Sequence, residues 1–243
     1  MTPRSTRTAY LTAAFLSVGL LSACSSGGPQ PGVAAVVGEE SIRVSEVNRL
    51  TDGFCEAARR DFQGQGDVYP MNVLSSVVLQ ALAMNSIIDQ LADDYDVEPS
   101  LAFEQQAADR EQSFSTLDPD QAEAALLVQG SALHRDDILT GIGRQELEEA
   151  GVAEPSVDDA LAQGNDILSV WLVENPPRID PQYHLTMDTP QAGSVDTTTS
   201  HAVTTAAVDA MLADQFAIRA LEADETDRFT DYVRSLPATQ RCG

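Results

Sequence analysis

The chain of 243 residues carries 38 acidic and 14 basic side chains, which give it a formal net charge of −24. Nucleic acids and anionic membrane surfaces are bound through clustered cations, so this charge argues against both as partners. The same charge suits a well-solvated domain, and an apolar fraction of 43% is enough for a packed core.

Residues 1–23 have the order of a secretory signal peptide: two arginines, an apolar stretch at 11–21, and small residues at its end. The stretch is well short of the roughly 20 residues that span a bilayer. The run Leu21-Ser22-Ala23-Cys24 resembles the lipobox of bacterial lipoproteins. This resemblance implies that Cys24 carries a lipid, which anchors the mature chain at the extracytoplasmic face of the cell membrane. The alternative is an ordinary signal peptide followed by a free cysteine.

Residues 24–32 are rich in Ser, Gly and Pro and predict a flexible tether. The apolar run Val33–Val37, a turn at 38–40 and the alternating segment Ser41–Val44 then predict a small β-hairpin. Ser45 is expected to cap the helix that follows. The apolar positions of that helix are Val47, Leu50, Phe54 and Ala58.

Helical periodicity dominates the middle of the chain. The clearest helix spans Leu74–Leu91, and another begins at Pro99. Asp118 and the proline after it open a long helical region, which glycines are expected to break into two or three pieces. Ser156 is expected to cap one more helix, which the segment Asn175-Pro176-Pro177 stops. The glycines are Gly130, Gly141 and Gly143.

The chain changes character after this helix. Ile179, Tyr183 and Leu185 are typical of an extended segment, so we expect a strand there. Residues 188–202 are rich in Thr, Ser and Gly and predict a flexible loop. Residues 203–243 predict a C-terminal helical segment that packs on the domain.

Cys55 and Cys242 are the two cysteines besides Cys24. Two cysteines in an exported chain are most simply a disulfide, which here ties the first helix to the C-terminal end. The chain-entropy model gives so long a loop about 4–5 kcal/mol of stabilisation. Two unpaired thiols are the alternative.

The opening Ala-Val-Val-Gly-Glu-x-x-Ile-x-Val-Ser-x-Val at Ala35–Val47, with a helical chain behind it, resembles the SurA-type N-terminal chaperone domain. The layout is also similar to that of short actinobacterial lipoproteins that carry only this module. The resemblance implies a mainly α domain at 33–187, with a small N-terminal β-hairpin and a late strand at Ile179–Met187 that pairs with it. In that family the module binds unfolded or extended polypeptide outside the cytoplasm.

Full foldases of this family also carry a parvulin prolyl-isomerase domain, whose active site uses paired histidines. This chain has only His134, His184 and His201, in separate segments, and a helical pattern where that domain would have to lie. We therefore expect no isomerase activity. An envelope hydrolase is a third hypothesis, but no Gly-x-Ser-x-Gly elbow and no Gly-rich phosphate loop occurs in the sequence, so we expect no enzyme function and no cofactor. The carboxylate clusters lack the pattern of an EF-hand loop, so no metal site is expected.

Three residues on the apolar face of the Leu74–Leu91 helix are candidate peptide contacts: Val77, Met84 and Ile88. Methionine adapts its shape easily, so such a stripe suits promiscuous apolar ligands. The alternative is that the stripe belongs to the core of a helix bundle, where amphipathic helices usually bury this face.

These features together predict a membrane-anchored, extracytoplasmic lipoprotein that binds unfolded or extended polypeptide without ATP. The alternative is a lipoprotein scaffold that docks one specific envelope partner and has no general chaperone activity. An open apolar cleft between helices favours the binder, whereas a closed bundle with one flat apolar patch favours the scaffold.

Replacing Cys24 with alanine tests the anchor. Because the Cys24 thiol is the group that the lipobox resemblance assigns to the lipid, Cys24→Ala should leave the precursor uncleaved or release the protein to the medium. Membrane fractionation and mass spectrometry of the N-terminus measure both effects. A mature, membrane-bound form of the variant would contradict lipidation at this residue.

Overall fold

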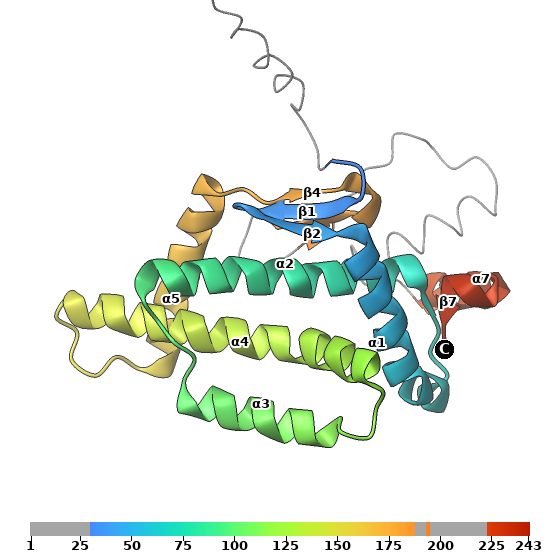
Figure 1. Ribbon diagram of the computed structural model, residues 1–243, viewed down its shortest axis with the longest axis horizontal. Coiled ribbons are helices and arrows are strands. Elements are labelled where there is room, and N and C mark those ends of the chain that lie inside the picture. The colour runs from blue at the N-terminus through green and yellow to red at the C-terminus, as the bar shows by residue number, and fades with distance from the viewer. Residues whose placement is uncertain (1–29, 188–192, 195–222) are drawn as a thin grey trace, which may run out of the picture.

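The computed structural model describes residues 30–187, 193–194 and 223–243 (Figure 1). The elements of the first part are β1 (Val33–Val37), β2 (Glu40–Arg43), α1 (Val44–Gln65), β3 (Tyr69–Pro70), α2 (Met71–Tyr95), α3 (Leu101–Ser113), α4 (Pro119–Glu149) and α5 (Val157–Glu174). They are followed by β4 (Arg178–Ile179), the 3-10 turn η1 (Pro181–Tyr183), β5 (Leu185–Thr186), β6 (Gly193–Ser194), α7 (Ala223–Ser235), the 3-10 turn η2 (Ala238–Gln240) and β7 (Arg241–Cys242).

Several predicted segments lie outside the described residues. They are the signal peptide with Cys24, most of the tether, most of the loop predicted at 188–202, and the start of the C-terminal helical segment. Within that loop, Gly193 and Ser194 are described and pair with β5 as the strand β6.

The fold is mainly α with a small antiparallel sheet, which confirms the predicted class (Figure 1). The sheet has the order β2-β1-β4 and lies on α2. Helix α4 packs on the opposite side of α2, and α3 lies beyond α4. Helix α5 crosses α4 at one end of the molecule, while α7 lies at the other.

The predicted hairpin is present, with Val37 opposite Glu40 across a two-residue turn. Gly38 opens this turn at φ +58, in the left-handed region that glycine adopts without strain. Two polar side chains of α2 hold the hairpin in place. Gln90 Nε2 donates to the Val37 carbonyl at 3.1 Å, and the Ser86 hydroxyl donates to the Glu40 carboxylate.

The late strand also pairs with the hairpin, since Ile179 lies opposite Ala35. The prediction of one continuous strand over Ile179–Met187 is wrong, because the chain turns through η1 between β4 and β5. Pro181 has no N–H to offer a sheet, and the Asp180 side chain accepts a hydrogen bond from the Gln182 N–H at 3.0 Å, which favours the turn.

Helix α2 is the centre of the core. The side chains of Leu79, Ile87, Ile88 and Leu91 are 0% exposed and pack against the sheet and the other helices. Among the described helices, α2 alone is long and apolar enough to cross a membrane by length and composition. Its burial within the domain accounts for that apolar character, since a core helix meets the same criteria.

The predicted breaks in the long helical region are absent, because α4 is one helix of 31 residues. Gly143 instead faces α5. A Cβ at Gly143 would overlap the carbonyl oxygen of Ala160, and a Cβ at Gly164 would overlap that of Leu139. The two helices therefore touch main chain to main chain, and the packing outweighs the cost of about 1 kcal/mol for each glycine in a helix.

Two of the predicted helix starts differ from those observed. Helix α1 begins at Val44 with Arg43 as its N-cap, so Ser45 lies inside the helix and does not cap it. The helix expected at Pro99 begins at Leu101, where Ser100 accepts a hydrogen bond from the Phe103 N–H. The cap at Ser156 is confirmed, and α5 ends before the two prolines, as predicted.

The predicted disulfide is confirmed: Cys55 on α1 and Cys242 on β7 have Cα atoms 5.7 Å apart and sulfurs 2.05 Å apart. Both cysteines are buried, and β7 pairs with β3. Nearby, Phe229 and Val233 of α7 pack on Val68 in a separate small cluster. The described part of the C-terminal segment is thus fixed to the domain by a covalent bond and by apolar contact.

Replacing Gly164 with alanine tests the contact between α4 and α5. The added methyl group overlaps the Leu139 carbonyl, so Gly164→Ala should lower the free energy of unfolding by about 1–3 kcal/mol. The matched control is Gly130→Ala, which adds the same group where no atom lies within 4 Å. That change should raise the free energy of unfolding by about 1 kcal/mol. Urea unfolding measures both values, and equal effects would contradict the close contact.

Candidate functional site

Helix α3 is held to the rest of the domain at its two ends. At its start, Asp137 of α4 accepts hydrogen bonds from the Ser100 N–H at 2.8 Å and the Ser100 hydroxyl at 2.6 Å. Towards its other end, Arg110 donates to the carbonyl of Gln129 at 2.6 Å. No residue of α3 is fully buried. Polar contacts near the ends, together with the half-buried Phe103, whose ring centroid lies 5.3 Å from that of His134, therefore set the position of this helix.

Between these contacts α3 and α4 enclose an apolar groove with a volume of about 570 Å³. Its walls are formed mainly by Phe103 and Ala107 of α3 and by Leu126, Leu127, Gly130 and Leu133 of α4. A Cβ at Gly130 would meet no atom within 4 Å, so the groove is open at this point of α4. Its volume falls within the roughly 300–1,000 Å³ of ligand pockets.

Two polar atoms at the base of the groove lack hydrogen-bond partners among the described residues. They are Asn85 Oδ1, from α2, and His134 Nδ1, from α4. The other ring nitrogen of His134 lies 2.8 Å from Asp89 Oδ1. When Nε2 donates its proton to that carboxylate, the neutral ring leaves Nδ1 as an acceptor. In that tautomer Asn85 Oδ1 and His134 Nδ1 are both unsatisfied acceptors, buried beside the apolar walls of the groove.

Both atoms are closed off from solvent in this structure, although their residues line the groove. A buried acceptor without a donor costs about 1–3 kcal/mol. A ligand can reach these two atoms only when the residues around them move, and one of those residues is Phe103 of α3, whose ring centroid lies 5.3 Å from that of His134. The arrangement can therefore hold a molecule that combines apolar side chains with hydrogen-bond donors.

The peptide contacts predicted from the sequence lie elsewhere. Met84 is 5% exposed and Ile88 is 0% exposed, and both belong to the main core. The peptide-binding hypothesis is wrong for these two residues, because the sheet and the neighbouring helices already cover that face of α2. Val77 is 37% exposed but does not line the groove.

The histidines do not converge either, as far as the structure describes them. His134 lies on α4 and His184 follows η1, whereas His201 lies outside the described residues. Among residues 30–187, 193–194 and 223–243, no group of three or more His, Cys, Asp or Glu side chains is placed to hold a metal ion.

The groove residues were missed because α4 carries two apolar stripes. One stripe, with Ile138 and Ile142, faces the core. The other consists of Leu126, Gly130 and Leu133, which fall on one face at a spacing of four and then three residues. This second stripe, together with Phe103 and Ala107 at a spacing of four, is the sequence signal that could have located the groove.

The chain forms a mainly α domain with a small sheet on one side of α2 and an apolar groove between α3 and α4. No protein-family model matches the chain, and neither a curated protein nor a solved structure matches it significantly.

Replacing Asp137 with alanine tests the attachment of α3. The change removes both hydrogen bonds at the start of α3, each with a net worth of about 1 kcal/mol, so local opening should increase about 30-fold. Hydrogen exchange of the amides at 101–113 measures this opening. The control is Asp136→Ala, whose carboxylate contacts Arg135 on its own helix. If α3 exchanges equally in both variants, Asp137 does not hold the helix.

Proposed function

We propose that this protein is a membrane-anchored, extracytoplasmic lipoprotein that binds unfolded or extended polypeptide without ATP. The apolar groove between α3 and α4 is the observation that carries the proposal. An exposed apolar segment of a client enters the groove and is thereby withheld from aggregation. The net charge of −24 keeps the protein and its bound client in solution.

The chemistry of the groove suits a polypeptide better than a purely apolar ligand. A polypeptide supplies apolar side chains for the walls and main-chain N–H groups for Asn85 Oδ1 and His134 Nδ1. Donors for these atoms offset the cost of leaving them unsatisfied. A lipid tail or a hydrocarbon offers no such donor.

The size of the groove is consistent with release without ATP. Full burial of one large apolar side chain contributes about 1.5–3 kcal/mol, and a groove of this volume holds only a few such groups. After the cost of ordering a flexible chain, the remaining affinity is modest. A client can therefore dissociate spontaneously and try to fold again.

The layout of the domain gives further support. The SurA-like opening at Ala35–Val47 forms the expected hairpin, and β4 pairs with it, as the resemblance implies. The groove, however, lies on the α3 side of the helical body and not on the α2 face that the sequence suggested. By the criterion of an open apolar cleft, this geometry favours a general binder over a scaffold for one partner.

Filling the groove tests the proposal. Gly130→Leu places a side chain in the open space, and leucine is a better helix former than glycine by about 1 kcal/mol, so the fold should be retained. This variant should lose at least about tenfold in affinity for an unfolded client, the equivalent of about 1.4 kcal/mol. Fluorescence anisotropy of a labelled apolar peptide and light scattering of an aggregating client measure the loss.

The matched control is Gly64→Leu on α1, where no atom lies within 4 Å of the added Cβ either. It should bind the peptide and suppress aggregation as the unmodified protein does. Equal activity of Gly130→Leu and the unmodified protein would overturn the role of the groove. Failure of the unmodified protein to protect any of several unrelated clients would instead favour the scaffold.

A further inference from the structure

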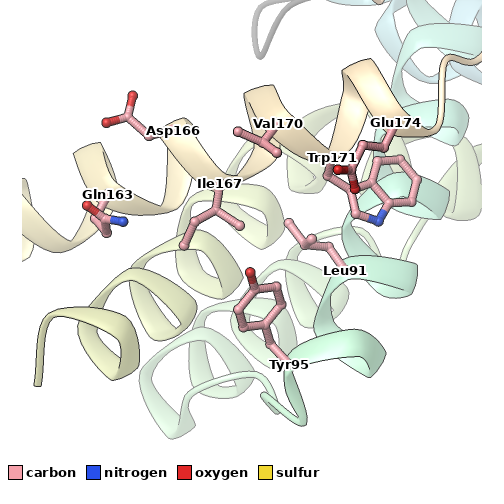
Figure 2. A pocket seen from close by; sticks show the side chains of 8 residues that line it. All are labelled: Leu91, Tyr95, Gln163, Asp166, Ile167, Val170, Trp171 and Glu174. Carbon is pink, nitrogen blue, oxygen red and sulfur yellow. The ribbon is translucent and has the colours of Figure 1, made fainter. Parts of the chain in front are cut away.

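We propose a second binding site, in the pocket between α2 and α5, for an arginine or lysine side chain of a polypeptide partner whose neighbouring residues are apolar. This site shares no lining residue with the groove between α3 and α4 and does not depend on the function proposed for that groove. Figure 2 shows its walls.

The pocket has a volume of about 270 Å³. Helix α2 contributes Leu91 and Tyr95, and α5 contributes the remaining lining residues, which are Gln163, Asp166, Ile167, Val170, Trp171 and Glu174. The Tyr95 hydroxyl points into the space below Ile167, while Trp171 and Glu174 lie together at one end (Figure 2). Two aromatic rings and two carboxylates thus belong to one small pocket, and no basic residue lines it.

An apolar surface borders this pocket. Val170 is 60% exposed and Val173 is 77% exposed, although Leu172 beside them is only 2% exposed. Large apolar side chains at such exposure are few among the described residues, and these two lie one helical turn apart on the solvent side of α5. They provide a contact for aliphatic residues next to the bound cation.

The electrostatic surroundings of the pocket are negative. Trp171 Nε1 donates to Asp94 Oδ2 at 3.2 Å, which holds this carboxylate at the edge of the indole ring. Burial raises the pKa of the Tyr95 hydroxyl, and the charges of Glu146, Asp94 and Glu174 raise it further. Three carboxylates therefore act on one aromatic side chain in the pocket.

The positions of the carboxylates oppose helix stability. Asp93 and Asp94 lie in the last turn of α2, and Glu174 is the last residue of α5. The carboxyl end of a helix carries partial negative charge and favours cations, yet neither helix has a basic residue in its last turn. A cationic ligand offsets the unfavourable negative charge at the carboxyl ends of both α2 and α5. Residues that break a local rule in this way are expected at functional sites.

An organic cation fits the pocket better than a metal ion. A guanidinium or ammonium group gains from the faces of aromatic rings and from carboxylates that lie apart. Among the described residues no group of three or more ligands is assembled for a metal ion. The apolar border at Val170 and Val173 further selects a cation that belongs to a polypeptide.

Intrinsic fluorescence tests the site directly, because Trp171 is the single tryptophan of the chain. The probe is a capped tripeptide with arginine between two leucines, and its counterpart has citrulline, which is uncharged, in place of arginine. Titration of the full chain with the arginine peptide should give a saturable change in emission that weakens as salt is raised. The citrulline peptide should bind at least about threefold more weakly.

Two variants localise the response. Glu174→Gln removes a carboxylate of the pocket and should lower the affinity for the arginine peptide about threefold. Asp231→Asn removes the same charge from α7, at the opposite end of the molecule, and should leave the affinity for the arginine peptide unchanged (Figure 1). Gly130→Leu should leave the fluorescence response intact, which separates this site from the groove. Equal effects of Glu174→Gln and Asp231→Asn would reduce the binding to general charge attraction and overturn the site.

A crosslinking experiment gives an independent answer. The chain contains no lysine, so every amide that a carbodiimide forms between a lysine side chain and a carboxylate joins the probe peptide to the protein. With a capped leucine-lysine-leucine peptide, the amides should concentrate on Glu174 and Asp166, which line the pocket, and on Asp94 beside Trp171. Amides spread evenly over the exposed carboxylates would contradict the proposal.

Discussion

The main-chain contact between α4 and α5 determines where both candidate sites lie. Gly143 and Gly164 allow the two helices to approach until side chains on either glycine would collide with the partner's carbonyl groups. Such a contact permits little sliding or rotation, because any added atom has no space. Helix α4 carries one wall of the groove, and α5 carries most of the acidic pocket. One tightly packed crossing thus fixes the two surfaces relative to each other.

Helix α3 shows the opposite design. It contributes no fully buried residue, and hydrogen bonds near its ends, with the ring contact between Phe103 and His134, determine its place beside α4. An element with few buried contacts opens at low free-energy cost, whereas the body of α1, α2, α4 and α5 opens only with the core. The domain therefore combines a frame of packed helices with one wall that has few buried contacts, which suits the client binding proposed for the groove. The acidic pocket lies between two helices of the frame and has no such freedom.

The sequence predicted correctly those features that depend on neighbouring residues, such as helix ends and turns. Ser156 as a cap, the prolines after Asn175 and Gly38 in the hairpin turn act through neighbouring residues, and the structure has each of them as expected. The disulfide was also predictable, because a chain that is expected to be exported offered one obvious pair. Ser45 failed as a cap because Arg43 already begins the helix from the end of β2.

The errors arose where distant packing decides the outcome. The sequence predicted that the glycines of α4 break the helix. Gly143 instead allows α4 to lie in contact with α5, which follows it in the sequence. The sequence predicted that Met84 and Ile88 belong to a binding stripe, but in the structure the sheet and the neighbouring helices cover both residues. The groove depends on the distance between α3 and α4. The spacing of apolar residues within either helix does not predict that distance. The acidic pocket likewise brings together residues from α2 and α5 that only the fold makes neighbours.

The bond between Cys55 and Cys242 has a consequence for proteolysis. It closes a covalent ring that includes all of α2, α3, α4 and α5, with a sequence separation of 187 residues. A protease that cuts once anywhere inside this ring opens it but leaves both fragments in one molecule. Under oxidising conditions the two fragments of such a nicked protein stay covalently joined, and they separate only when the bond is reduced. Only a cut before Cys55 or after Cys242 detaches a piece outright.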